Sequence, residues 1–102
     1  MDIMEKIKQQ LVENPIMLYM KGSPERPHCG FSARAVQCLQ AYNVPFNSLD
    51  VLANPEFRQA LPKYANWPTF PQLYVNGELI GGADIIAELH ASGELRAILT
   101  GE

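Results

Sequence analysis

The feature that most constrains the fold is an unbroken run of apolar residues, Ile16–Met20, early in a chain of 102 residues. Side chains alternate between the two faces of a strand, so a run without polar residues predicts a strand that is buried on both faces. Asn14-Pro15 comes just before the run, and Gly22 and Pro24 follow it, so residues that break regular structure bound the strand. A strand of this kind belongs to a sheet covered by helices, which predicts an α/β fold.

Helical patterns alternate with strand-like patterns along the rest of the chain. Asp2 is placed to cap the first helix, and Asn54-Pro55 opens another with proline in its first turn, where proline costs no hydrogen bond. Proline deeper in a helix does cost one, so this helix is expected to end near Leu61-Pro62. The expected helices cover residues 2–14, 30–42, 54–62 and 84–93, with a final turn or two from 95 to 99.

The second half of the chain contains the clearest turn signal. Asn76-Gly77 separates two short strand patterns, Gln72–Val75 and Glu78–Ile80, and this dipeptide favours the tight turn of a β-hairpin. Another strand is expected from Phe46 to Val51. The resulting order, α-β-α-β-α-β-β-α-α, predicts a four-stranded mixed sheet flanked by about five helices, in a single domain of residues 1–102. This is the thioredoxin-like architecture.

Charge and cysteine content exclude several classes of function. The formal net charge is −3 at pH 7, so the chain lacks the positive charge with which proteins bind nucleic acids and anionic membranes. No apolar run approaches the length of a membrane span, and residues 1–6 follow an amphipathic helix pattern rather than that of a signal peptide. Two cysteines without an export signal indicate free thiols in a reducing compartment. We therefore expect a small cytoplasmic protein.

Cys29 is the candidate reactive group. A two-cysteine redox site would have a second cysteine three residues later, but Ser32 stands there. At the start of a helix the Cys29 sulfur meets unpaired backbone N–H groups and the positive end of the helix dipole, and Lys21 adds positive charge nearby. These surroundings favour the thiolate. The alternative, a small buried cysteine with no reactivity, fits poorly with a junction between a loop and a helix.

Cys38 is not a suitable partner for Cys29. It lies nine residues further along the same helix, which is half a revolution around the helix and about 13 Å along its axis. The Cα atoms of a disulfide lie within about 7 Å of each other, so we expect Cys38 at the edge of the apolar face instead. His28, beside the thiol, is a candidate base or ligand, although a solvated loop histidine is the simpler interpretation. His90 is expected at the surface.

Residues 67–71 predict one wall of a binding groove. Trp67-Pro68-Thr69-Phe70-Pro71 precedes a strand, and Pro71 suits a cis peptide bond in a tight turn. Such a bond would leave the backbone of Phe70 free to pair with an extended peptide. The alternative is an ordinary proline-rich turn.

Charged side chains and backbone N–H groups predict a carboxylate-binding site at each end of this groove. Gly81-Gly82-Ala83-Asp84 at a helix start exposes N–H groups that can hold a carboxylate, although Asp84 can also simply cap the helix. Arg58, Lys63 and Lys21 are candidates for holding a second carboxylate, although each alone would be a solvated surface charge. Together these features describe a site for a small thiol peptide with a carboxylate at each end.

Four motifs combine into one pattern. They are Lys21-Gly22-Ser23-Pro24, Cys29-Gly30-Phe31-Ser32, Trp67-Pro68-Thr69-Phe70-Pro71-Gln72 and Gly81-Gly82-Ala83-Asp84. With these motifs the chain resembles the monothiol, CGFS-type glutaredoxins, and in particular their short single-domain bacterial members. The resemblance extends from the first helix to about Leu99, and the combination of motifs is highly specific.

The resemblance implies a glutathione site. Lys21 and Arg58 would hold the glycine carboxylate, and the backbone of Phe70 would hold the cysteinyl unit. The backbone N–H groups of Ala83 and Asp84, with the Asp84 side chain, would hold the γ-glutamyl end.

The resemblance also implies a homodimer bridged by a 2Fe–2S cluster, with BolA-type proteins and apo iron–sulfur proteins as partners. Cys29 would then be both the catalytic thiol and the metal ligand. Such a cluster needs four thiolates, and Cys29 from each of two chains plus two glutathione thiolates complete that number. Many family members have cysteine where this chain has Ala83, so a disulfide between Cys29 and that position is excluded here. The cluster site does not need that cysteine.

Three functions remain in competition. The leading one is an iron–sulfur carrier that receives 2Fe–2S clusters from a scaffold and passes them to apo proteins. The second is a glutathione-dependent monothiol oxidoreductase, in which free glutathione resolves a mixed disulfide on Cys29. The third is an interaction module that senses iron status through a cluster-bridged complex with a BolA-type partner.

Overall fold

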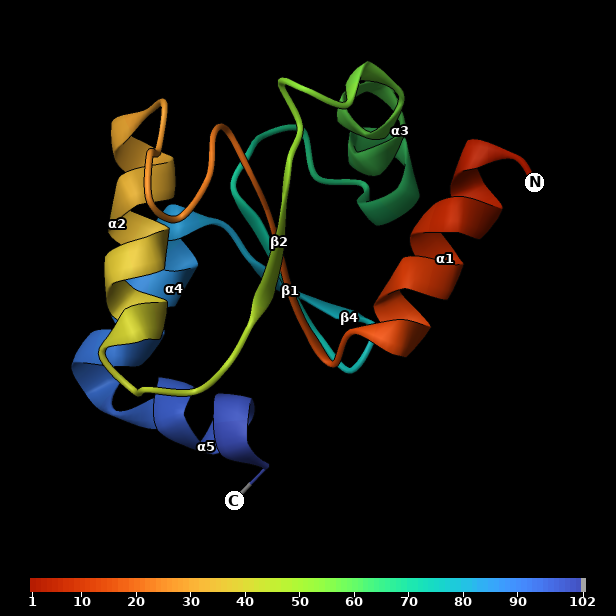
Figure 1. Ribbon diagram of the computed structural model, residues 1–102. Helices are drawn as coiled ribbons and strands as arrows, with labels where there is room; N and C mark the ends of the chain where they lie inside the picture. The colour runs from red at the N-terminus through yellow and green to blue at the C-terminus, as the bar shows by residue number, and fades with distance from the viewer. Residues whose placement is uncertain (102) are drawn as a thin grey trace.

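The apolar run Ile16–Met20 forms β1, an inner strand of a four-stranded sheet with the order β2-β1-β3-β4. Strand β1 pairs in parallel with β2 and antiparallel with β3, so the sheet is mixed as the sequence predicts. The computed structural model describes residues 1–101 (Figure 1). The elements are α1 (Ile3–Glu13), β1 (Ile16–Met20), α2 (Gly30–Gln40), β2 (Asn47–Asp50), α3 (Pro55–Ala65), β3 (Gln72–Val75), β4 (Glu78–Gly81), α4 (Ala83–Ser92) and α5 (Glu94–Thr100).

Helices cover both faces of the sheet. Figure 1 shows α1 and α3 on one side of the strands and α2, α4 and α5 on the other. Alternate side chains of β1 divide between the two layers: Leu18 packs into the cluster formed with α2, α4 and α5, and Tyr19 packs into the cluster formed with α1 and α3. Every residue of β1 is buried, which confirms the prediction of a strand enclosed on both faces.

The hairpin between β3 and β4 forms at the predicted dipeptide. Asn76 and Gly77 have φ values of 51° and 82°. Positive φ at both central residues is the geometry of a type I′ turn, whose twist matches that of the flanking strands. Local sequence alone therefore fixes this part of the sheet.

Helix α3 corrects one prediction. It does not end near Leu61-Pro62 but continues through Pro62 to Ala65. Proline lacks an N–H donor and crowds the preceding turn, but the Pro62 carbonyl still accepts hydrogen bonds from the N–H groups of Asn66 and Trp67, which continue the helix. Asn66, in the left-handed conformation with φ 51°, ends the helix instead. The extra turn carries the chain to Trp67, at the start of the segment that walls the site.

None of the helices within residues 1–101 is both long enough and apolar enough to span a bilayer.

We predict that Leu18→Ala lowers the free energy of unfolding by about 2–5 kcal/mol, because it leaves a cavity between the sheet and the layer of α2, α4 and α5. Leu18 is fully buried, whereas Val12 on α1 is 78% exposed. Val12→Ala therefore serves as the control and should change stability by less than about 0.5 kcal/mol. Urea denaturation followed by circular dichroism measures both values. Equal effects of the two substitutions would contradict the assignment of β1 as the inner strand.

Candidate functional site

Cys29 is the N-cap residue of α2. Its Sγ accepts a hydrogen bond from the backbone N–H of Ser32 at 3.3 Å, which satisfies one of the free donors at the helix start. The residue is half-buried, and its sulfur is a free thiol. The helix therefore presents its positive end to the sulfur, as the sequence predicts.

Ser32 connects the thiol to the sheet. This residue is fully buried, and its Oγ lies 3.3 Å from the Cys29 Sγ. The same oxygen accepts a hydrogen bond from the backbone N–H of Lys21 at 3.1 Å, directly after β1. With that bond in place, the hydroxyl proton of Ser32 is available to the sulfur. From the sequence, Ser32 was recognised only as the residue that replaces a second cysteine. Its contact with Lys21 could not be predicted, because the two residues are brought together only by the fold.

The surroundings of Cys29 stabilise its thiolate. Partial burial disfavours the charged form, but it is outweighed by hydrogen bonds from the Ser32 hydroxyl and amide, then by the Phe31 amide and the charge of Lys21. The pKa of the Cys29 thiol is consequently lower than its ordinary value. The thiolate is the form that attacks disulfides and binds metal ions.

Asp50 holds the loop that leads from β1 to the thiol. Its Oδ1 accepts hydrogen bonds from the N–H groups of Gly22 and Leu52, both at 2.9 Å. The bond from Gly22 is the largest cause that keeps the pKa of Asp50 below its ordinary value. Gly22 has φ +90°, and a Cβ atom there would lie 2.4 Å from the carbonyl oxygen of Arg26, so the loop requires glycine at this position. Nothing in the local sequence pointed to this role of Asp50.

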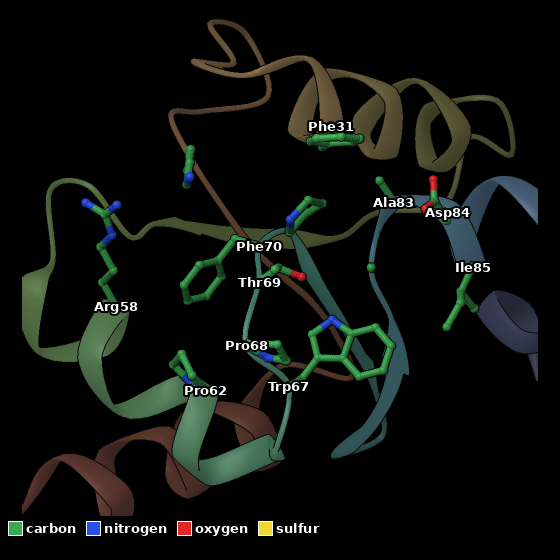
Figure 2. Close-up of a pocket in the computed structure, with 13 residues that line it drawn as sticks. Phe31, Arg58, Pro62, Trp67, Pro68, Thr69, Phe70, Ala83, Asp84 and Ile85 are labelled. Carbon is green, nitrogen blue, oxygen red and sulfur yellow. The ribbon is translucent and has the colours of Figure 1, made fainter.

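A groove of about 660 Å³ is lined by Phe31, two residues after Cys29, and by Lys21; Cys29 itself is not among its lining residues. The groove contains all five predicted binding residues, and Figure 2 shows Arg58 at one end and Asp84 at the other. Phe31 lies along the upper edge in this view, and its side chain is 61% exposed. Sequence reasoning missed the contributions of Phe31, Pro62 and Ile85, which depend on how the elements pack. The lining residues are Lys21, Phe31, Arg58, Pro62, Trp67, Pro68, Thr69, Phe70, Pro71, Gly82, Ala83, Asp84 and Ile85.

The buried side-chain amide of Gln72 holds residues 67–71, the segment that forms the groove wall between Arg58 and Asp84. The Nε2 of Gln72 donates to the carbonyl oxygens of Trp67 at 3.0 Å and Thr69 at 3.2 Å, and its Oε1 accepts from the Tyr74 hydroxyl at 2.9 Å. Gln72 is fully buried, so these bonds are shielded from water. The peptide bond before Pro71 is cis, as predicted.

The start of α4 differs in detail from the prediction. Gly82 is the N-cap residue, and Asp84 lies in the first turn without capping the helix. A Cβ atom on Gly82 would lie 3.2 Å from the carbonyl oxygen of Pro71 and 3.4 Å from the Nε1 of Trp67, so glycine lets the two walls approach closely. The Asp84 carboxylate faces solvent and pairs with Arg34 at 3.7 Å.

Several residues considered from the sequence lie elsewhere. Lys63 lines a separate hollow beside the start of α1 and is not among the residues that line the groove. Cys38 is buried in the core and free, and burial raises the pKa of its thiol. His28 is exposed, and His90 is exposed with its Nδ1 2.6 Å from the Tyr42 hydroxyl. Within residues 1–101, no three His, Cys, Asp or Glu side chains are grouped to hold a metal ion.

Comparison with known proteins agrees with this arrangement of thiol and groove. Residues 16–80 match the Glutaredoxin family. A Glutaredoxin 4 from Haemophilus ducreyi is 62% identical, and the match covers 97% of this chain and 92% of that protein. The chain belongs to the glutaredoxin family. With Ser32 in place of a second active-site cysteine, it is a monothiol glutaredoxin.

Solved glutaredoxin structures share the fold. Reduced poplar apo GrxS14 is 44% identical with a TM-score of 0.78, and the match covers 90% of this chain and 84% of the poplar chain. A monomeric truncated mutant of Trypanosoma brucei 1-C-Grx1 is 33% identical with a TM-score of 0.87, covering 99% and 92% of the two chains. The thioredoxin-like fold predicted from the sequence is confirmed.

We predict that Ser32→Ala raises the pKa of Cys29 in this glutaredoxin, because the thiolate loses the hydroxyl that donates to it. The pH dependence of alkylation by iodoacetamide measures the change: the midpoint should move to higher pH. Ser92→Ala, at the far end of α4, is the matched control and should leave the midpoint unchanged. A Cys29→Ser variant defines the background rate from Cys38. An unchanged midpoint in Ser32→Ala would show that the hydroxyl does not stabilise the thiolate.

Proposed function

We propose that this monothiol glutaredoxin binds glutathione in its groove and, as a homodimer, carries a 2Fe–2S cluster for transfer to apo proteins. The observation that carries the proposal is the position of Cys29. Its thiol has a lowered pKa, and Phe31, two residues further on, lines a groove with Arg58 at one end and the start of α4 at the other. A thiol peptide with a carboxylate at each end complements such a groove.

Glutathione fits the charges along the groove. Lys21 and Arg58 are the two cationic residues that line the groove, so we assign them to its glycine carboxylate. The Phe70 backbone is available to its cysteinyl unit. The N–H groups of Ala83 and Asp84 begin α4, where a helix favours a carboxylate, and the exposed Asp84 carboxylate, which pairs with Arg34, can also contact an ammonium group. In this arrangement the glutathione sulfur lies toward Cys29.

The number of available thiolates supports a shared cluster. A 2Fe–2S cluster takes four ligands, commonly thiolates. Each chain offers one accessible thiol, Cys29, because Cys38 is buried in the core. Two chains and two glutathione molecules therefore complete the ligand set, and a two-fold axis passing close to Cys29 would bring the two Cys29 thiols together. Half of the ligands would then be exchangeable, which suits transfer of the cluster as cargo.

The partners in this proposal follow from the family resemblance. They are a second copy of the chain when the cluster is bound, a BolA-type protein and apo iron–sulfur proteins, all in the cytoplasm. A cluster-bridged complex with a BolA-type protein would also allow the pair to sense iron status. Size-exclusion chromatography of the reconstituted protein with and without a BolA-type partner tests this part of the proposal.

The lowered pKa of Cys29 favours a second candidate function, a glutathione-dependent oxidoreductase. The Cys29 thiolate attacks the glutathione sulfur of a glutathionylated protein, forming a mixed disulfide and releasing the protein thiolate. A free glutathione thiolate then attacks the mixed disulfide, which yields oxidised glutathione and regenerates the Cys29 thiolate. No second protein cysteine is required.

Anaerobic reconstitution with iron, sulfide and glutathione separates the two functions. The carrier predicts visible absorption of a 2Fe–2S cluster and a dimer mass, and it predicts that omission of glutathione abolishes both. A colourless monomer that rapidly reduces glutathionylated substrate would refute the carrier and support the oxidoreductase. Normal cluster yield without any added thiol would refute glutathione as the external ligand.

We predict opposite outcomes for substitutions at the two cysteines. Cys29→Ser should abolish cluster binding, because it removes the accessible thiolate from each chain. Cys38→Ala should keep full cluster binding, because its sulfur is enclosed in the core. Iron and sulfide content per chain measures both, with circular dichroism as the check on folding. Cluster loss in a folded Cys38→Ala variant would contradict the proposed ligand set.

A further inference from the structure

Arg34 lies at the Asp84 end of the groove without being part of the site described so far. It belongs to α2, and its Nη1 is 3.7 Å from the Oδ1 of Asp84 at the start of α4. The two side chains remain 56% and 82% exposed. An ion pair this open adds little to stability, typically about 0–1 kcal/mol. Both charges are therefore available to a ligand.

The charges at this end of the groove would otherwise conflict with the proposed ligand. The γ-glutamyl unit carries an α-ammonium and an α-carboxylate on the same carbon. Asp84 suits the ammonium, but its negative charge repels a carboxylate bound at the same helix start. Lys21 and Arg58 line the groove with Asp84, but Figure 2 shows Arg58 at the far end. Arg34 is the cation that the structure pairs with Asp84.

We propose that Arg34 determines specificity for the γ-glutamyl end by binding its α-carboxylate while Asp84 binds its α-ammonium. The inference rests on the proposed binding of glutathione. Arg34 and Asp84 already place a positive and a negative charge side by side. The ligand's α-carboxylate can lie next to Arg34 and its α-ammonium next to Asp84, so that the four charges alternate in sign. Each charge then has an opposite charge as its neighbour, and the carboxylate is no longer left facing Asp84 alone. Arginine suits this role because its planar group contacts two carboxylates at once.

Three ligands test the two halves of this arrangement. Glutathione has both charges, 4-aminobutyryl-cysteinyl-glycine lacks the α-carboxylate, and glutaryl-cysteinyl-glycine lacks the α-ammonium. Titrations followed by protein-observed NMR measure each dissociation constant for the intact chain. Arg34→Gln should weaken glutathione and the glutaryl peptide by about two- to fivefold, the range of an exposed ion pair. Its affinity for the aminobutyryl peptide should not fall, because this ligand has no α-carboxylate for Arg34 to bind and its ammonium no longer competes with Arg34 for Asp84.

Matched variants separate a local contact from a general loss of charge. Arg96→Gln removes the same charge from α5, where the guanidinium stacks over Tyr42, and should leave all three affinities unchanged. Arg34→Lys keeps the charge and should retain most of the glutathione affinity. The loss in Arg34→Gln should shrink at high salt, because exposed charges are screened.

The outcomes that overturn the inference are distinct from failure of glutathione binding itself. If Arg34→Gln binds glutathione as tightly as the unsubstituted chain, or more tightly, Arg34 does not hold the carboxylate. An equal loss for glutathione and the aminobutyryl peptide also overturns the role. If the unsubstituted chain binds no glutathione, the proposed function fails and this inference fails with it.

Discussion

The hydroxyl group of Ser32 joins the parts of the molecule on which the site depends. Its oxygen accepts from the Lys21 amide at the end of β1 and lies 3.3 Å from the Cys29 sulfur at the start of α2. One buried atom thereby sets the position of the thiol relative to the sheet. Because this oxygen accepts from Lys21, the Ser32 hydroxyl proton can be donated to the Cys29 thiolate. The fold thereby helps to stabilise the charged form of the reactive group. Serine at this position has a physical role of its own.

The two layers of the fold serve different parts of the site. The layer with α2 and α4 supplies helix starts, where free N–H groups meet the thiol and the Asp84 end of the groove. The layer with α3 supplies Arg58 and leads through Pro62 to the wall at Trp67. Buried side chains cover both faces of the inner strands between them, and this packing holds the two layers together.

The predictions that succeeded rest on local sequence or on clear patterning. Ile16–Met20 and Asn76-Gly77 determine an inner strand and a hairpin turn with little help from the rest of the chain. The groove residues were found because each has its own signal in the sequence: a charge, a helix start or, for Phe70, the proline that follows it. The contacts of Ser32, Asp50 and Arg34 could not be predicted, because their partners lie on other elements of the fold. The extra turn of α3 beyond Pro62 was missed for a related reason: helix ends depend on what the following residues bind.

Trp67 gives this groove an optical property. It is the single tryptophan in the chain, and it lines the wall between the cationic end and the start of α4. Its indole N–H is buried with no hydrogen-bond partner among residues 1–101, next to Gly82. Indole emission is sensitive to local polarity and to nearby quenchers, and here no second tryptophan contributes background. Intrinsic fluorescence of the unlabelled protein can therefore be used to follow the binding of added ligands in the groove, and absorption by the proposed iron–sulfur cluster would quench this emission.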